Sequence, residues 1–318
     1  MPDSDPPPRI LRVAGSRRGG RVASRPGVLD VTRRLATLER RVEDALASAG
    51  QSATLVPPLE SMVDGVLGAY ARLRRAVAGE HAAAAELIAA PLDFLYRWWW
   101  RVDVIGLERL PPRGPVFVAA NRAGALMPYE AFMLARALGQ PYGGRAAHPL
   151  VDDWLLQLPL AGAAARALGA LPATAESVRR TLAAGEVTIS FPEGPAAVAK
   201  PVARRYRLAP FARSSLLRVA VEAGAPIVPV AVVGAEEAQP VLWRIERLGR
   251  LLGLPAVPVT PALLPLPTKW TVHVGEPFDP PARGPRERRV LRDLGSRLRE
   301  RLQGLVSDGV NRRPGLFG

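Results

Sequence analysis

The chain has 318 residues, 48% hydrophobic and 23% charged, which suffices for one large domain with appended segments or two smaller domains. This composition excludes collagen-like, coiled-coil and fully disordered proteins. Its 43 basic and 29 acidic residues give a net charge of +14, which points to nucleic acid, anionic lipid or an anionic substrate. Because nearly all the basic residues are arginine and Ala, Gly and Pro are abundant, part of this charge could also reflect a GC-rich genome.

The absence of cysteine excludes disulfide bonds, a thiolate nucleophile and zinc sites of the cysteine type. The three histidines, His81, His148 and His273, are too far apart in the sequence to indicate a histidine-based metal site. We therefore expect neither a metal ion nor a bound redox cofactor.

The first part of the chain is expected to be an arm followed by helices. Residues 1–26 carry many Arg and Pro residues but no apolar core of signal-peptide length, which predicts a disordered basic arm. Residues 27–94 form a predicted helical region. Apolar residues recur at three- and four-residue steps from Val28 to Ala49 and from Leu59 to Val77, which indicates a helical hairpin. A third helix is expected from Ala82 to about Trp99.

This third helix ends in three consecutive tryptophans, Trp98, Trp99 and Trp100, between Arg97 and Arg101. Consecutive helical positions point about 100° apart, so the three rings cannot all face one core. Tryptophan beside arginine is typical of the membrane interface, and we expect the three rings to contact a membrane. The alternative is an aromatic plug between the helical region and the following domain.

From residue 95 to residue 280 the pattern changes to strands alternating with helices, which predicts an α/β domain with a largely parallel central sheet flanked by helices. Residues 281–318 form a closing amphipathic, basic helix with a tail; its apolar positions run from Val290 to Leu305. The expected strands are Val116–Ala120, Val187–Phe191, Ile227–Val233 and Thr271–Val274, and the expected helices are Glu130–Leu138, Ser177–Ala184, Ser215–Ala223 and Arg286–Val306.

The uncharged apolar stretch from Leu251 to Thr268 has about the length that spans a bilayer. Its prolines preclude a continuous helix, so we do not expect a transmembrane span. Such a loop either packs on its own domain or lies against something apolar outside it.

Ligands of open parallel sheets bind beyond the carboxyl ends of the strands, so the loops that follow each strand carry the candidate site. Three loops qualify: Asn121 to Glu130, the Pro192-Glu193-Gly194 turn with the basic run after it, and Gly234 to Glu237. The basic run contains Lys200, Arg204, Arg205, Arg207 and Arg213.

Residues from about Leu95 to Pro280 resemble the glycerophospholipid (lysophosphatidate-type) acyltransferase superfamily, in its bacterial branch. The resemblance rests on the order and spacing of several short pieces rather than on any one of them. These pieces are Trp100-Arg101-Val102, Gly114-Pro115-Val116, Val118-Ala119-Ala120-Asn121, Phe191-Pro192-Glu193-Gly194, Arg205-Tyr206-Arg207-Leu208, Ala225-Pro226-Ile227-Val228-Pro229-Val230 and Val233-Gly234-Ala235-Glu236-Glu237.

The resemblance implies transfer of an acyl group from acyl-coenzyme A or acyl carrier protein to a hydroxyl of a lysophospholipid or similar acceptor. The family's first motif supplies a histidine base oriented by an aspartate. Its Phe-Pro-Glu-Gly motif and nearby basic residues position the acceptor. By this resemblance the substrate-binding residues are Asn121, Phe191, Pro192, Glu193, Gly194, Arg205, Arg207 and Arg213.

The first motif departs from the family pattern, because Arg122 stands in place of the histidine and Glu130 is the nearest counterpart of the aspartate. An arginine side chain stays protonated near neutral pH and cannot act as a base. General-base catalysis contributes roughly 100- to 10,000-fold to a rate. We expect Arg122 and Glu130 to form an ion pair across the site; the alternative is a decayed site in which both point into solvent.

Two functions follow from the resemblance: an acyltransferase that works at the membrane surface, or a catalytically inactive homologue that binds lipid or an acyl carrier. The expected partners are a lipid or lysolipid, a peripheral membrane surface and acyl carrier protein. Nucleic-acid binding is disfavoured, because only 6% of residues are aromatic and no nucleic-acid motif occurs. Thioester donors are made in the cytoplasm, so we expect the protein on the inner face of the cytoplasmic membrane.

Overall fold

The structure is a computed structural model that describes residues 81–122, 127–139, 145–198, 200–212, 214–252, 256–261, 265–279, 288–313 and 315. All of them belong to one compact unit. The predicted arm, residues 1–26, and the two predicted helices before residue 80 lie outside the described residues.

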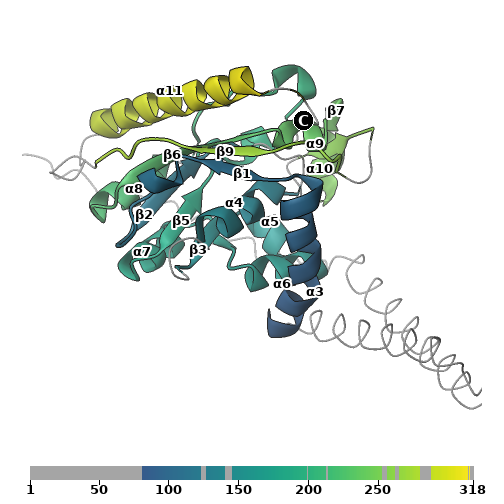
Figure 1. Cartoon of the computed structure of the whole chain (residues 1–318), viewed down its shortest axis with the longest axis horizontal. Coiled ribbons are helices and arrows are strands. Elements are labelled where there is room, and N and C mark those ends of the chain that lie inside the picture. Colours follow the sequence, from purple (N-terminus) through teal and green to yellow (C-terminus); the bar gives the residue numbers. More distant parts are fainter. Residues whose placement is uncertain are drawn as a thin grey trace, which may run out of the picture. The chain divides into compact units, whose positions relative to one another are not determined.

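A seven-stranded sheet forms the centre of this unit, in the order β1-β9-β6-β2-β5-β3-β4 (Figure 1). The five strands from β6 to β4 run parallel, whereas β9 pairs antiparallel with β6, and β1 runs parallel to β9. The predicted, largely parallel α/β fold is therefore confirmed. The strands are β1 (Asp103–Ile105), β2 (Val116–Ala120), β3 (Ala147–Val151), β4 (Leu171–Pro172), β5 (Val187–Ser190), β6 (Ile227–Val233) and β9 (Thr271–Val274).

Helices cover both faces of the sheet, which is why β2 and β6 are buried along their whole length and read as unbroken apolar runs. Figure 1 shows α11 lying along the sheet, where it packs on β6, β9 and α8. The helices are α3 (His81–Phe94), α4 (Tyr129–Gly139), α5 (Asp153–Leu156), α6 (Pro159–Ala167), α7 (Ala175–Ala183), α8 (Ser214–Glu222), α9 (Ala235–Ala238), α10 (Glu246–Leu252) and α11 (Arg288–Arg312).

The two faces of the sheet contribute to separate hydrophobic clusters, as the alternation of side chains along a strand requires. On β2, Val118 packs in a cluster with Leu134 of α4. Its neighbour Phe117 belongs to the other cluster, with Leu217 of α8 and Leu298 of α11. The first face is therefore covered by α4, and the second by α8 and α11.

The three tryptophans differ sharply in exposure. A π-helical turn, Leu95–Trp99, follows α3, and its Trp98 side chain is 73% exposed. Trp99 is half-buried and its indole N–H donates to the Pro265 carbonyl at 2.9 Å. Trp100 is fully buried and stacks on Trp270, with ring centroids 4.2 Å apart. The prediction of membrane contact is thus wrong for Trp100, which is the aromatic plug.

In the described part of the chain, which includes 251–252, 256–261 and 265–268 of the apolar stretch, no helix is long and apolar enough to cross a bilayer. Strand β8 (Val257–Val259) pairs antiparallel with β7 (Trp243–Ile245). Ala256 and Thr268 are buried, so part of the stretch packs on its own domain, as one of the two alternatives predicted.

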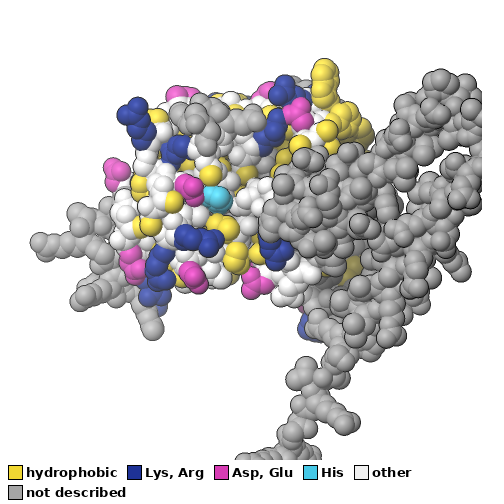
Figure 2. Space-filling view, turned by 90° about the horizontal axis from the view of Figure 1, so that it is seen from below, with side chains coloured by type: hydrophobic (Ala, Val, Ile, Leu, Met, Phe, Trp, Pro, Cys, Tyr) yellow, Lys and Arg dark blue, Asp and Glu magenta, His cyan; other side chains and the backbone are white. Residues whose placement is uncertain are grey.

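Charged side chains are dispersed over the one face of the described residues that Figure 2 shows. On the face shown in Figure 2, lysine and arginine side chains are scattered among acidic and hydrophobic ones. On this face, the net charge of +14 does not gather into one basic patch of the kind that binds nucleic acid.

Candidate functional site

Four parallel strands, β2, β3, β5 and β6, end at the same edge of the sheet, and the predicted site loops follow three of them. Arg122 follows β2, and Phe191 to Gly194 follows β5. Gly194 has a φ of 63°, a left-handed conformation that glycine adopts without strain and that closes this turn. The fold therefore brings the two motifs of the resemblance together at one edge.

Arg122 and Glu130 form the predicted ion pair. Arg122 Nε lies 3.4 Å from Glu130 Oε1, and the side chains are only 4% and 0% exposed. Helix α4 places Glu130 in its first turn, where a carboxylate is favoured by the helix dipole. On the other side, the guanidinium carbon of Arg122 lies 5.7 Å from the centre of the Phe191 ring. The alternative, with both side chains in solvent, is wrong.

This pair is unusual in its lack of hydrogen bonds. Neither Arg122 Nε nor either oxygen of Glu130 has a hydrogen-bond partner among the described residues. These three atoms therefore lack the hydrogen bonds that normally offset the desolvation of a buried ion pair.

Glu193 joins the two loops. One carboxylate oxygen accepts the backbone N–H of Arg122 at 2.8 Å, and the other accepts that of Ala209 at 2.6 Å. Burial raises the pKa of Glu193, although Lys200 and these two N–H groups act in the opposite direction. Glu193 is 0% exposed and fastens the Arg122 loop to the basic run; its contact with substrate stays a prediction.

The Asn121 side chain also forms hydrogen bonds with backbone groups. Its amide group donates to the Val232 carbonyl at 3.0 Å, and its amide oxygen accepts the Val232 N–H at 2.7 Å. Both ends of the side chain are thus used across β2 and β6, and the residue is 1% exposed. Its contact with substrate also stays a prediction.

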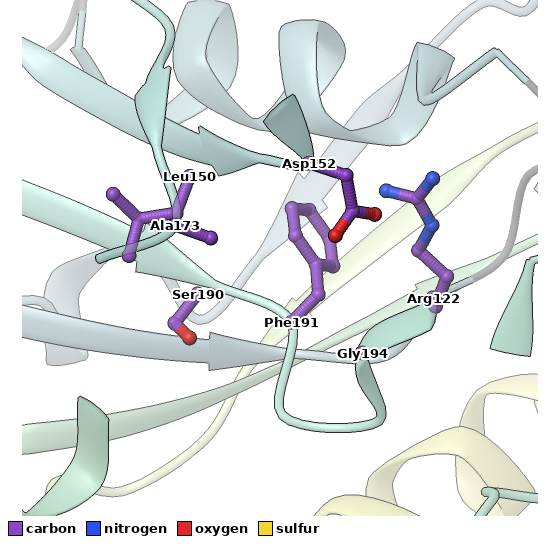
Figure 3. Close-up of a pocket in the computed structure, with 7 residues that line it drawn as sticks. All are labelled: Arg122, Leu150, Asp152, Ala173, Ser190, Phe191 and Gly194. Carbon is purple, nitrogen blue, oxygen red and sulfur yellow. The ribbon is translucent and has the colours of Figure 1, made fainter. Parts of the chain in front are cut away.

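A small polar cavity lies beside Arg122, with a volume of about 10 Å³, room for about one water molecule. Asp152, which follows β3 and was not predicted, faces the Arg122 guanidinium across it (Figure 3). The residues that line the cavity are Arg122, Leu150, Asp152, Ala173, Ser190, Phe191 and Gly194.

A second, apolar pocket of about 240 Å³ lies between α3, α4 and α6. Its Met127 and Tyr129 belong to the segment that leads into Glu130, so this pocket adjoins the first-motif loop. The lining is almost entirely hydrophobic and includes Ile88, Leu92, Leu95, Phe132, Ala165 and Leu168.

The basic run is secured by a second ion pair, from Lys200 Nζ to Glu236 Oε1 at 2.8 Å. The other Glu236 oxygen accepts the Tyr206 backbone N–H at 3.1 Å. Burial raises the pKa of Glu236 to about 7, against the opposing effect of Lys200. Two pieces of the resemblance, far apart in the sequence, thus contact each other.

The other residues predicted to bind an anion either do not line the polar cavity or lie outside the described residues. Arg205 and Arg207 are exposed, and neither lines the polar cavity. Pro192 lines a separate small cavity with Phe211 and Leu298. Arg213 lies outside the described residues.

Neither His148 nor His273 stands near Arg122 as a substitute base. On β3, His148 Nδ1 donates to the Gly169 carbonyl at 2.9 Å, and its Nε2 lies 2.9 Å from a Glu186 oxygen. His273 of β9 faces α11, on the face of the sheet opposite α4. Burial lowers the pKa of His273.

Comparison with known proteins agrees with the resemblance. The acyltransferase family model matches residues 101–233, which include β2, both site loops and β6. An uncharacterised protein of Mycobacterium leprae is 33% identical over 92% of this chain and 89% of its own length. The chain belongs to the acyltransferase family.

Two further proteins resemble the chain. An uncharacterised protein of Mycobacterium tuberculosis is 34% identical to this acyltransferase-family chain, over 84% of it and 82% of the relative. The crystal structure of the 1-acyl-sn-glycerophosphate acyltransferase of Thermotoga maritima is 20% identical, with a TM-score of 0.47 over 74% of this chain and 83% of that one.

Proposed function

We propose that this acyltransferase-family protein binds an acyl-bearing lipid or acyl thioester at a membrane surface without the histidine-dependent acyl transfer of its family. The observation that carries the proposal is the buried Arg122–Glu130 pair, which occupies the place of the family's histidine and aspartate. A guanidinium group donates hydrogen bonds and accepts none, so it cannot take the proton of an attacking hydroxyl.

Two features support ligand binding. The apolar pocket beside Tyr129 suits an acyl chain, because each buried methylene contributes about 0.8 kcal/mol. The polar cavity beside Arg122 suits an anionic or carbonyl oxygen of the ligand, since a guanidinium group recognises such oxygens well. Acyl-coenzyme A, acyl carrier protein with its acyl group, and lysophospholipids share this combination of an apolar chain and polar oxygens.

We further propose peripheral association with the inner face of the cytoplasmic membrane. Trp98, with 73% of its side chain exposed, is available for contact with lipid, and Trp99 is available in part. Scattered arginines add attraction to anionic lipid of about 1 kcal/mol each when they approach the membrane surface.

One observation favours acyl transfer as the second candidate function. Asp152 faces Arg122 across the polar cavity, and an ionised carboxylate can accept a proton from a hydroxyl. Transfer by this route would depend on Asp152 rather than on Arg122.

The test measures acyl transfer from palmitoyl-coenzyme A to lysophosphatidate by the unmodified protein and by Arg122→His, Arg122→His with Glu130→Asp, and Asp152→Asn variants. We expect no turnover by the unmodified protein, with saturable binding of both compounds by calorimetry. Turnover that appears in the His/Asp double variant would locate the defect at the missing base. Turnover by the unmodified protein that is lost in Asp152→Asn would replace this proposal by the second candidate.

A further inference from the structure

Strands β7 and β8 with helix α10 form a projecting unit, here called the 242–259 ribbon, that lies near α9 at one end of the described fold (Figure 1). Eight large hydrophobic residues are conspicuously exposed in the part of the chain that the structure describes, and five of them belong to this ribbon. They are Leu242, Trp243, Ile245, Leu248 and Val259, with Trp243 71% exposed. Such a concentration marks an interaction surface.

Strand geometry gathers three of these side chains on one face. Trp243 and Ile245 are two residues apart on β7 and therefore point the same way. Trp243 lies directly opposite Val259 on β8, and Ile245 lies opposite Val257. Arg244, between them, points to the other face. The result is a continuous apolar surface on a two-stranded ribbon.

The charge around this surface is positive. Residues 242–259 contain Arg244, Arg247 and Arg250 against one acidic residue, Glu246, which pairs with Arg244 at 2.9 Å. Arg247 and Arg250 of α10 are exposed. Tryptophan and aliphatic side chains beside exposed arginines have the composition of a segment that lies in the interface of an anionic membrane.

A protein partner suits this surface less well. A stable protein interface uses about 20 to 30 residues on each side. The described part of the ribbon, residues 242–252 and 256–259, is smaller than such an interface, and five of its residues are exposed and apolar. A lipid headgroup layer, in contrast, can receive a narrow projecting element and needs no complementary surface.

The ribbon packs on the segment that follows the Phe191 to Gly194 turn. Val241 and Ala256 pack with Val198, just beyond the Phe191 to Gly194 turn, and the Val202 N–H donates to the Val241 carbonyl at 2.8 Å. Gly249 of α10 approaches Ala256 so closely that a Cβ would lie 2.5 Å from the Ala256 Cα. The ribbon is therefore in contact with the segment that leads into the basic run.

We propose that the 242–259 ribbon docks the protein on an anionic lipid bilayer, with Trp243, Ile245 and Val259 entering the headgroup layer. The inference rests on the membrane association proposed above and names the element that makes it. Docking through the ribbon would hold the Glu193 and Lys200 loops next to the bilayer, where a lipid ligand could reach the pockets.

The test is sedimentation of the full chain with vesicles of phosphatidylcholine and phosphatidylglycerol. In the triple variant Trp243→Thr, Ile245→Thr and Val259→Thr, which keeps residues that favour strands, we expect the vesicle partition coefficient to fall about tenfold or more. Arg247→Gln with Arg250→Gln should remove much of the salt dependence of binding. The matched controls are Ile105→Thr, at a 46% exposed strand position on β1, and Arg289→Gln with Arg292→Gln on α11.

A second measurement covers the case in which the triple variant fails to fold. Brominated lipid should quench the tryptophan fluorescence of the unmodified protein more than that of Trp243→Phe. Equal quenching, or unchanged vesicle binding by a folded triple variant, overturns the ribbon assignment alone. Failure of the unmodified protein to bind vesicles overturns the membrane association itself. A dimer in the absence of lipid that the triple variant abolishes would show that the face binds a second copy instead.

Discussion

The ion pairs Arg122–Glu130 and Lys200–Glu236 both lie beyond the carboxyl ends of parallel strands, and both are almost fully buried. In the Lys200 pair every charged group is hydrogen-bonded: the ammonium donates to Glu236 at 2.8 Å and to the Arg207 carbonyl at 3.3 Å. The second Glu236 oxygen accepts from Tyr206. In the Arg122 pair, Nε and both carboxylate oxygens lack such partners among the described residues.

This difference in hydrogen bonding indicates that the two ion pairs have different roles. A buried pair offsets its desolvation only when hydrogen bonds satisfy its charges. The Lys200 pair has these hydrogen bonds and holds the basic run against α9, although burial still raises the pKa of Glu236. In the Arg122 pair, Nε and both carboxylate oxygens do not meet this condition, and the pair borders the polar cavity, which is consistent with the ligand binding proposed above.

Removal of Arg122 alone should have the largest effect on stability. Arg122→Met leaves the Glu130 carboxylate buried with neither a charge partner nor a hydrogen bond, and we expect the free energy of unfolding to fall by about 3 to 5 kcal/mol. The double variant Arg122→Met with Glu130→Leu should recover nearly all of this, because no charge remains buried.

Urea unfolding of both variants measures these effects, with the exposed Arg292→Met as control, expected within about 0.5 kcal/mol of the unmodified protein. A single variant as stable as the unmodified protein would show that Glu130 has another partner in solution.

The pH dependence of stability should report on the second pair. The unfolded chain releases the Glu236 proton near pH 4.5, whereas the folded protein, with the pKa raised by burial, holds it to about pH 7. The folded state binds more protons between these values, so the free energy of unfolding falls as the pH rises through this window. We expect a loss of about 3 kcal/mol, at 1.36 kcal/mol for each pH unit.

Urea unfolding between pH 4.5 and pH 8 tests this expectation, with Glu236→Gln as the comparison, since a glutamine does not titrate. An equally steep profile in Glu236→Gln would assign the dependence to another group.

Long, unbroken apolar runs are the parts of the fold that the sequence predicts best. Val116–Ala120 and Ile227–Val233 are buried on both faces, so they read as unbroken apolar runs. Strand β3, Ala147–Val151, was not predicted, because it contains a histidine and a proline. Asp152 was missed with it, since the search for site residues followed the predicted strands. The apolar pair Leu150-Val151, followed directly by an acidic residue, could have indicated both the end of a strand and Asp152.

The sequence predicts which residues lie at the candidate site, but not which groups they contact. The resemblance located Arg122, Glu130 and Glu193, and the opposite charges predicted the Arg122 pair. Sequence reveals that Asn121 and Glu193 carry hydrogen-bonding groups, but not which donors they meet. Those donors are the backbone N–H groups of Val232 and Ala209, among others, and only the packing of distant segments places them there.

Glu193 lies between the two pairs and should transmit changes from one to the other. In Glu193→Gln one of the two carboxylate oxygens becomes an N–H₂ group that faces a backbone N–H, which should cost about 1 to 3 kcal/mol. The charge of Glu193 also raises the pKa of Glu236, so its removal should move the pH window of stability downward. An unmoved window in the same urea titrations would show that the two loops titrate independently.

The smallest effect is expected from Arg122→Lys, which keeps the charge and removes the fork of hydrogen-bond donors. The lysine ammonium would lie one bond beyond the position of Nε, which is now 3.4 Å from Glu130, and could approach the carboxylate. The main loss would be the contact with the Phe191 ring, about 0.5 to 1 kcal/mol in the free energy of unfolding. Arg122→Gln, which removes the charge at similar length, should cost several times more. If urea unfolding gives equal losses for both, geometry rather than charge holds Glu130, and the distinction between the two pairs disappears.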